Sequence, residues 1–149
     1  MRYMLAFTAL RRHIEGEGMN ANTQADLGKL VLRIALGVLV LLHGVAKLRG
    51  GVGPIGEMLA AHGLPAALAY GALVGEVVGP LLLIAGFYAR IGALLVMVNM
   101  LFAFFLAHLG QLGMLNETGG WQLELQGMYL GTAIALALLG PGRYSVNGR

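Results

Sequence analysis

Four long apolar segments constrain the fold of this chain more than any other feature. They cover residues 27–48, 66–88, 90–109 and 121–140, and an α-helix needs about 20 largely apolar residues to cross a bilayer. Of the 149 residues, 58% are hydrophobic and only 11% are charged, whereas soluble domains carry about 25% charged residues. The sequence therefore predicts an all-α fold, an integral membrane four-helix bundle with short loops.

The residues before the first apolar segment do not fit this plan. Their short apolar start is followed at once by basic residues, without the small-residue cleavage pattern of a signal peptide. We interpret residues 1–25 as an N-terminal extension, disordered or upstream of the natural start, for which Met1 and Met19 are both candidates. The four-helix transmembrane domain is expected over residues 26–146.

Basic residues indicate the orientation, because they gather in cytoplasmic loops. The side that holds both termini carries most of them, and the opposite side carries only Lys47 and Arg49. We expect both termini in the cytoplasm and the protein in the bacterial inner membrane as a multi-pass protein. The 10 basic residues form no stripe suited to nucleic acid. The expected partners are membrane lipid and a protein partner or further copies of the chain.

Charged residues inside a membrane span cost about 2.5–3.5 kcal/mol, and those that persist mostly have a partner in the bundle. Glu76 lies near the middle of the second segment, and we expect Arg33 of the first segment to reach it. Asn99 lies near the centre of the third segment and suits an interhelical hydrogen bond. The sequence thus predicts a polar bundle core of Arg33, Glu76 and Asn99.

Glycine is frequent, with 24 residues, and small residues at a spacing of four let membrane helices approach closely. Several glycines share helix faces with the charged residues of the first two segments. The glycines expected to mediate helix packing are Gly37, Gly44, Gly71, Gly75 and Gly79.

A second polar group is expected in the half of the membrane away from the termini. Imidazoles, an amine and a carboxylate at this depth suit the carbonyl groups of a quinone, and facing histidines also suit a haem iron, although no spacing is diagnostic. The candidate contacts to a quinone or another ligand are His43, Lys47, His108 and Glu124. Trp121 and Tyr129 are interpreted as interfacial anchors.

Several chemistries receive no support from the sequence. The chain has no cysteine, which excludes disulfides, thiol exchange and cysteine-ligated iron–sulfur clusters within it. We find no Walker, HExxH or GxSxG motif, no predicted metal site, and no set of residues that identifies a catalytic centre.

Two runs, LRIALGVLVLLHGVAKL and GLPAALAYGALVGEVVGPLLLIAGFYARIGALL, resemble the DoxX family of small four-helix membrane proteins. The residues that carry the resemblance are Arg33, Gly37, His43-Gly44, Lys47-Leu48, the Gly63-Leu64-Pro65 turn, Glu76 and the Gly86 to Arg90 turn. The family is named from a subunit linked to a terminal quinol oxidase, and relatives are associated with thiosulfate:quinone oxidoreductases or oxidative stress. The resemblance implies a place near quinone-linked redox chemistry, without a mapped catalytic residue.

Three functions stay open at this point. The first is a subunit or accessory of a quinone-linked redox or oxidative-stress membrane system, an oxidoreductase-associated protein whose partner supplies the electron-carrying centre. The second is a small proton-coupled transporter that uses the mid-membrane Glu76. The third is a structural membrane scaffold in which Glu76 and Arg33 only lock the bundle.

Overall fold

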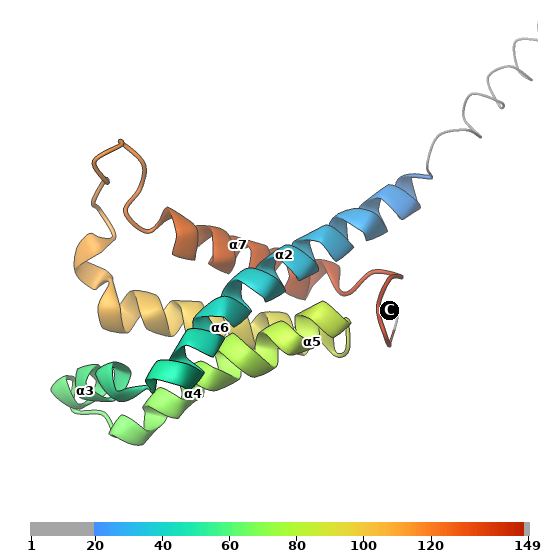
Figure 1. Cartoon of the computed structure of the whole chain (residues 1–149). Helices are drawn as coiled ribbons and strands as arrows, with labels where there is room; N and C mark the ends of the chain where they lie inside the picture. Colours follow the sequence, from blue (N-terminus) through green and yellow to red (C-terminus); the bar gives the residue numbers. More distant parts are fainter. Residues whose placement is uncertain (1–19, 148–149) are drawn as a thin grey trace, which may run out of the picture.

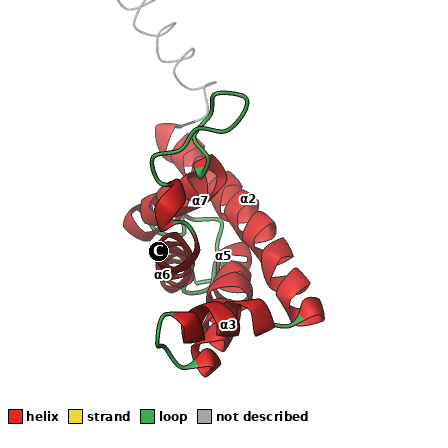
Figure 2. Cartoon of the chain, turned by 90° about the vertical axis from the view of Figure 1, so that its left-hand side faces the viewer, coloured by secondary structure: helices red, strands yellow, loops and turns green. Residues whose placement is uncertain are grey.

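The structure, a computed structural model, describes residues 20–147 and is helical over this range, with one isolated β-bridge and no strand. Three helices are long and apolar enough to cross a membrane, Ala21–Gly50 (α2), Ala66–Ala85 and Ala89–Ala107 (α6). The fourth, Glu124–Leu139 (α7), is shorter, with 16 residues. These four helices lie around a common interior and confirm the predicted all-α bundle (Figures 1 and 2).

The N-terminal extension lies largely outside the described residues, as do both candidate start methionines. Helix α2 begins at Ala21, where the Asn20 side chain accepts a hydrogen bond from the Asn22 N–H and so caps the helix. Its 30 residues span about 45 Å, which exceeds the hydrocarbon thickness of about 30 Å. The N-terminal part of α2 therefore projects past the rest of the bundle (Figure 1).

The second membrane helix changes its hydrogen-bonding pattern along its length. Its parts are η1 (Ala66–Tyr70), α4 (Gly71–Leu73), the π-helical η2 (Val74–Val78) and α5 (Gly79–Ala85). Pro80 has no N–H, so the carbonyl of Glu76 lacks its usual donor four residues on. The Gly79 N–H bonds to the Val74 carbonyl instead, the five-residue step of a π-helix. The apolar pattern of residues 66–88 predicted a helix here but not this bulge.

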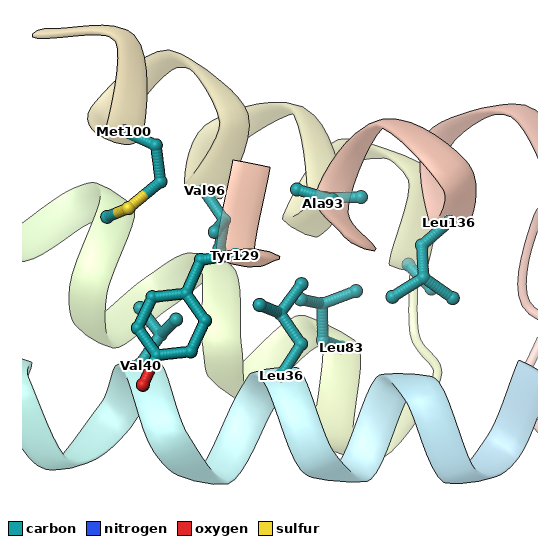
Figure 3. Packing of buried hydrophobic residues seen from close by; sticks show 10 residues of the cluster. Leu36, Val40, Leu83, Ala93, Val96, Met100, Tyr129 and Leu136 are labelled. Atoms are coloured by element: carbon teal, nitrogen blue, oxygen red, sulfur yellow. The ribbon is translucent and has the colours of Figure 1, made fainter. Parts of the chain in front are cut away.

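The interior of the bundle combines one apolar cluster with close glycine contacts. Leu36 and Val40 of α2 pack with Val96 of α6 and with Tyr129 and Leu136 of α7 (Figure 3). Lipid tails are as apolar as leucine, so the hydrophobic effect does not drive helices together inside a membrane. Close van der Waals packing holds them together instead. Glycines serve this packing, since a side chain at Gly37 or Gly92 would press into the second helix.

The two ends of the bundle carry different accessories. Helix α3 (Gly53–Ala61) and the loop over residues 108–123 lie at one end, here called the α3 end (Figure 1). The turn over residues 86–88 and the tail segment, residues 140–147, lie at the other, the tail end. The predicted orientation would place the tail end in the cytoplasm.

The loop at the α3 end is ordered by Trp121, whose ring stacks on Phe104 with centroids 6.0 Å apart. The Trp121 indole N–H also donates to the Leu112 carbonyl at 2.8 Å. Trp121 therefore belongs to the loop, and the fourth helix begins three residues later than predicted, at Glu124.

Candidate functional site

The most polar place inside the membrane domain is an ion pair between Lys47 and Glu76. The ammonium group of Lys47 donates to Glu76 Oε2, and the Asn99 amide donates to Glu76 Oε1 at 3.1 Å. Only 8% of the Glu76 side chain is exposed, against 26% of the Lys47 side chain. Three different helices thus converge on one buried carboxylate, and we call Lys47, Glu76 and Asn99 the Glu76 cluster.

Two glycines make this convergence sterically feasible. At Gly44 of α2, a Cβ would overlap the backbone carbonyl of Glu76, so the two helices touch there. At Gly75, a Cβ would overlap the side chain of Asn99, so α6 lies equally close on the other side. Gly79 continues this contact, since its Cβ would lie 3.0 Å from the Gly92 carbonyl oxygen. A Cβ at Gly71 would meet no atom within 4 Å, so Gly71 does not make the close helix contact predicted for it.

An apolar groove of about 570 Å³ ends on the Glu76 cluster. It runs between α3, the first half of the second membrane helix and α6, and its polar lining is Lys47, Glu76, Asn99 and His108. The remaining lining consists of apolar side chains and of Gly71 and Gly75. Leu68, Val98 and Phe102 line it and are also exposed on the membrane-facing surface. The groove is therefore open sideways toward lipid.

A smaller pocket of about 180 Å³ lies on the other side of the ion pair. Its polar lining is His43, Lys47, Glu76, His108, Gln126 and Tyr129. Lys47, Glu76 and His108 line both cavities, so the ion pair separates an apolar space from a more polar one. The His43 ring meets the Tyr129 ring edge-on, with centroids 6.2 Å apart.

Arg33 does not reach Glu76, in contrast to the prediction. The carbonyl of Glu76 lies beside Gly44, eleven residues from Arg33 and hence about 16 Å away along α2. Arg33 instead donates to the Tyr144 carbonyl at 2.6 Å at the tail end. The cation beside Glu76 is Lys47, which the sequence analysis placed with the outer polar group. The predicted polar core therefore consists of Glu76 and Asn99 with Lys47 in place of Arg33.

The other predicted ligand contacts divide in two. His43 and His108 line the small pocket with Lys47. His108 Nδ1 lies 3.0 Å from the Gln111 side-chain oxygen, so this ring is also in contact with the loop that follows α6. Glu124 lines neither cavity: it is exposed at the start of α7, beside Gly120.

Two residues of the small pocket were missed by the sequence analysis. Tyr129 is 8% exposed and lies inside the bundle next to Val40, not at the interface (Figure 3). Gln126 precedes it by one helical turn on the same face. A signal existed, since Tyr129, Ala133 and Leu136 follow the spacing of one buried helix face.

Within residues 20–147, no group of three His, Asp or Glu side chains converges as a metal site would require. The chemistry available at the Glu76 cluster is that of hydrogen bonding and proton exchange. Lys47 and Asn99 are donors, the Glu76 carboxylate is an acceptor, and His108 lines both cavities.

Comparison with known proteins agrees with the resemblance drawn from the sequence. A family model described as DoxX matches residues 28–109. The chain is 30% identical over 119 residues to a Bacillus subtilis (strain 168) protein named "Putative oxidoreductase CatD". This alignment covers 80% of the chain and 84% of that protein. No solved structure matches significantly.

Proposed function

Because this chain belongs to the DoxX family of membrane proteins, we propose that it binds a quinone in the apolar groove and acts as a membrane subunit of a quinone-linked redox system. The observation that carries the proposal is the groove itself, an apolar space of about 570 Å³ that opens toward lipid and ends on the Glu76 cluster. A quinone has the matching two-part chemistry, a polar ring with two carbonyl groups and a long apolar tail.

The residues of the Glu76 cluster fit both redox forms of such a ligand. Lys47 and Asn99 are donors suited to the carbonyl oxygens of the oxidised form, and the Glu76 carboxylate is an acceptor suited to a hydroxyl of the reduced form. A bound quinone would supply a couple of two electrons and two protons. Glu76 Oε2 and Lys47 Nζ would hold a proton beside the ligand, and His43 and Tyr129 continue the polar path on the far side.

The cellular setting of the protein is part of this proposal and is inferred from the name of the relative and from the sequence. The relative is named "Putative oxidoreductase CatD", and we infer a redox setting in the bacterial inner membrane, with a role in oxidative stress. A partner protein would carry the electron-transferring centre. The chain itself would bind the quinone and exchange protons with it.

Quinone binding is tested on the purified protein in detergent, using titration calorimetry with a quinone that carries a decyl tail. Gly71 lines the groove and has no atom within 4 Å of its Cβ position, so Gly71→Leu should fill the groove without disturbing the fold. We expect this variant to bind the quinone at least about tenfold more weakly, because the side chain takes up space that the tail needs. Glu124→Gln, at the same end but outside both cavities, should bind like the wild type.

Two results would count against the proposal. If the wild type shows no saturable binding, or if Gly71→Leu binds as tightly as the wild type, the groove is not a quinone site. A second case is that the wild type binds the quinone and Gly71→Leu binds it more weakly. If membrane vesicles that contain either protein then turn over quinone at the same rate, the role as a redox subunit is wrong.

A proton-coupled transporter is the second candidate, favoured by the position of the ion pair between two cavities. In that case protonation of Glu76 and binding of a cationic substrate would compete for one carboxylate. Proteoliposomes with a pH gradient distinguish the two functions. If the wild type takes up a lipophilic cation and Glu76→Gln abolishes this uptake, the result favours transport. If the wild type takes up no cation, the result excludes transport of this substrate class.

A further inference from the structure

Arg33 is a buried cation without an anionic partner among the described residues. The residue is 1% exposed, and the Glu76 carboxylate belongs to a distant part of the bundle. Nη2 donates to the Tyr144 carbonyl, whereas Nε and Nη1 have no hydrogen-bond partner within residues 20–147. A guanidinium has five N–H donors and a full positive charge. One neutral carbonyl therefore leaves this group poorly satisfied.

The element that supplies this carbonyl is the tail segment, residues 140–147. The tail segment carries Tyr144 over Arg33, and its Asn147 side chain accepts a hydrogen bond from the Tyr88 N–H at 3.2 Å. Gly86 closes the other side, because a Cβ there would overlap Nη1 of Arg33. The carbonyl partner of Arg33 thus lies on a short segment at the surface of the bundle rather than on a membrane helix.

Further cations surround the tail segment. Arg90 lies beside Gly140, where a Cβ would be 3.0 Å from its Nε. Lys29, one helical turn before Arg33, lies beside Gly142 and pairs with Asp26 at 3.2 Å. Asp26 is the acidic residue found next to the tail segment, so positive charge is in excess at this end of the described chain. Charge complementarity favours an anion here.

The site lies at the depth of the lipid headgroups. The turn over residues 86–88 connects two membrane helices, and Arg33 contacts this turn. Leu81 and Ile91, which lie on either side of the turn, are exposed apolar residues that face lipid. The turn is therefore at the membrane boundary, where anionic lipids attract basic residues.

We propose that the tail end binds the phosphate group of an anionic phospholipid, with Arg33 as its main contact and Arg90 as a second one. The phosphate would replace the Tyr144 carbonyl, and its charged oxygens would satisfy the donors that the carbonyl leaves free. Free phosphate shares this chemistry, but a phospholipid is favoured because the site adjoins helix faces that would contact its acyl chains. The proposal is independent of the quinone site at the opposite end.

Native mass spectrometry of the full-length protein tests this site, in micelles that contain phosphatidylglycerol at rising mole fractions. We expect Arg33→Gln to retain phosphatidylglycerol about tenfold more weakly, since hydrogen bonds to charged groups are worth at least that factor. Arg90→Gln, an exposed position, should show a smaller loss and keeps the test informative if Arg33→Gln does not fold. Arg49→Gln at the α3 end is the matched control and should retain lipid like the wild type.

Asn147→Ala distinguishes lipid binding from a purely structural role of Arg33. This change loosens the tail segment, so it should increase lipid retention if the Tyr144 carbonyl competes with a phosphate. Equal retention by the wild type, Arg33→Gln and Arg90→Gln would overturn the proposal, and so would equal retention of phosphatidylcholine by the wild type. Displacement of the lipid by inorganic phosphate at equal concentration would overturn the assignment to a phospholipid.

Discussion

Replacing Gly44 by alanine is expected to destabilise the protein, whereas the same replacement at Gly28 on the same helix is expected to stabilise it. A Cβ at Gly28 would have no atom within 4 Å beyond its own helix turn. A Cβ at Gly44 would overlap the backbone carbonyl of Glu76 and a methyl group of Val77. The two substitutions share their chemistry and their helix and differ only in what the new methyl group meets.

The magnitudes follow from two opposing effects. Alanine in a helix is favoured over glycine by about 0.5–1 kcal/mol, and Gly28→Ala should gain this amount. Overpacking costs about 1–3 kcal/mol, and the upper part of that range applies at Gly44, because a backbone carbonyl cannot rotate away as a side chain can. The difference predicts a net loss of about 1–2 kcal/mol for Gly44→Ala.

The measurement is thermal unfolding of both variants in the same detergent, followed by circular dichroism. Gly44→Ala should also weaken binding of the decyl quinone, because α2 carries Lys47 and must move away from Glu76. Gly28→Ala should bind the quinone like the wild type. A Gly44→Ala variant as stable as the wild type, or equal shifts in both variants, would refute the close contact between α2 and Glu76.

Three further substitutions test single contacts, each by the free energy of unfolding in detergent. Lys47→Met leaves the Glu76 carboxylate without its cation and should cost up to about 3 kcal/mol. Adding Glu76→Gln should recover part of this loss. If the losses of the two single variants simply add in the double variant, the two residues do not form a pair. Asn99→Leu removes one interhelical hydrogen bond, for which about 0.6 kcal/mol is average and about 1.7 the maximum, so an unchanged stability would speak against that bond. Trp121→Phe keeps an aromatic ring on Phe104 but removes the N–H donor, so the free energy of unfolding should fall by about 1 kcal/mol. A much larger fall would show that the stacking had changed as well.

The spans were predictable because they depend on the length and composition of one continuous segment. Three of the four expected segments correspond to helices that fulfil these criteria, and the fourth segment holds a shorter apolar helix. The start of α7 was harder to predict from the sequence. Trp121 is apolar and was counted into the span, but its indole bonds to the loop and its ring packs on Phe104. A hydropathy pattern does not register such a contact.

The pairing of charges was less predictable because it depends on how two helices are shifted against each other. Counting from the middle of each span places Arg33 close to Glu76. The actual register follows from glycine contacts, in which Gly37 meets Ile84 and Gly44 meets Glu76. This register brings Lys47 to the carboxylate and moves Arg33 to the turn after α5. Knowledge of which residues of the second membrane helix face Gly37 and Gly44 would have been needed to predict it.

The π-helical bulge explains why the carboxylate lies where three helices can reach it. Pro80 cannot donate a hydrogen bond, so the backbone carbonyl of Glu76 is free of the α-helical ladder. Gly44 faces this carbonyl without a side chain, and α2 therefore comes close enough for Lys47 to pair with the carboxylate of the same residue. The π-bulge and the buried carboxylate thus belong to the same residue, Glu76. Such π-bulges are frequent at functional sites. A leucine at position 76 would keep the bulge but leave Lys47 and Asn99 directed at an apolar group, so the carboxylate, and not the bulge alone, joins the three helices at this point.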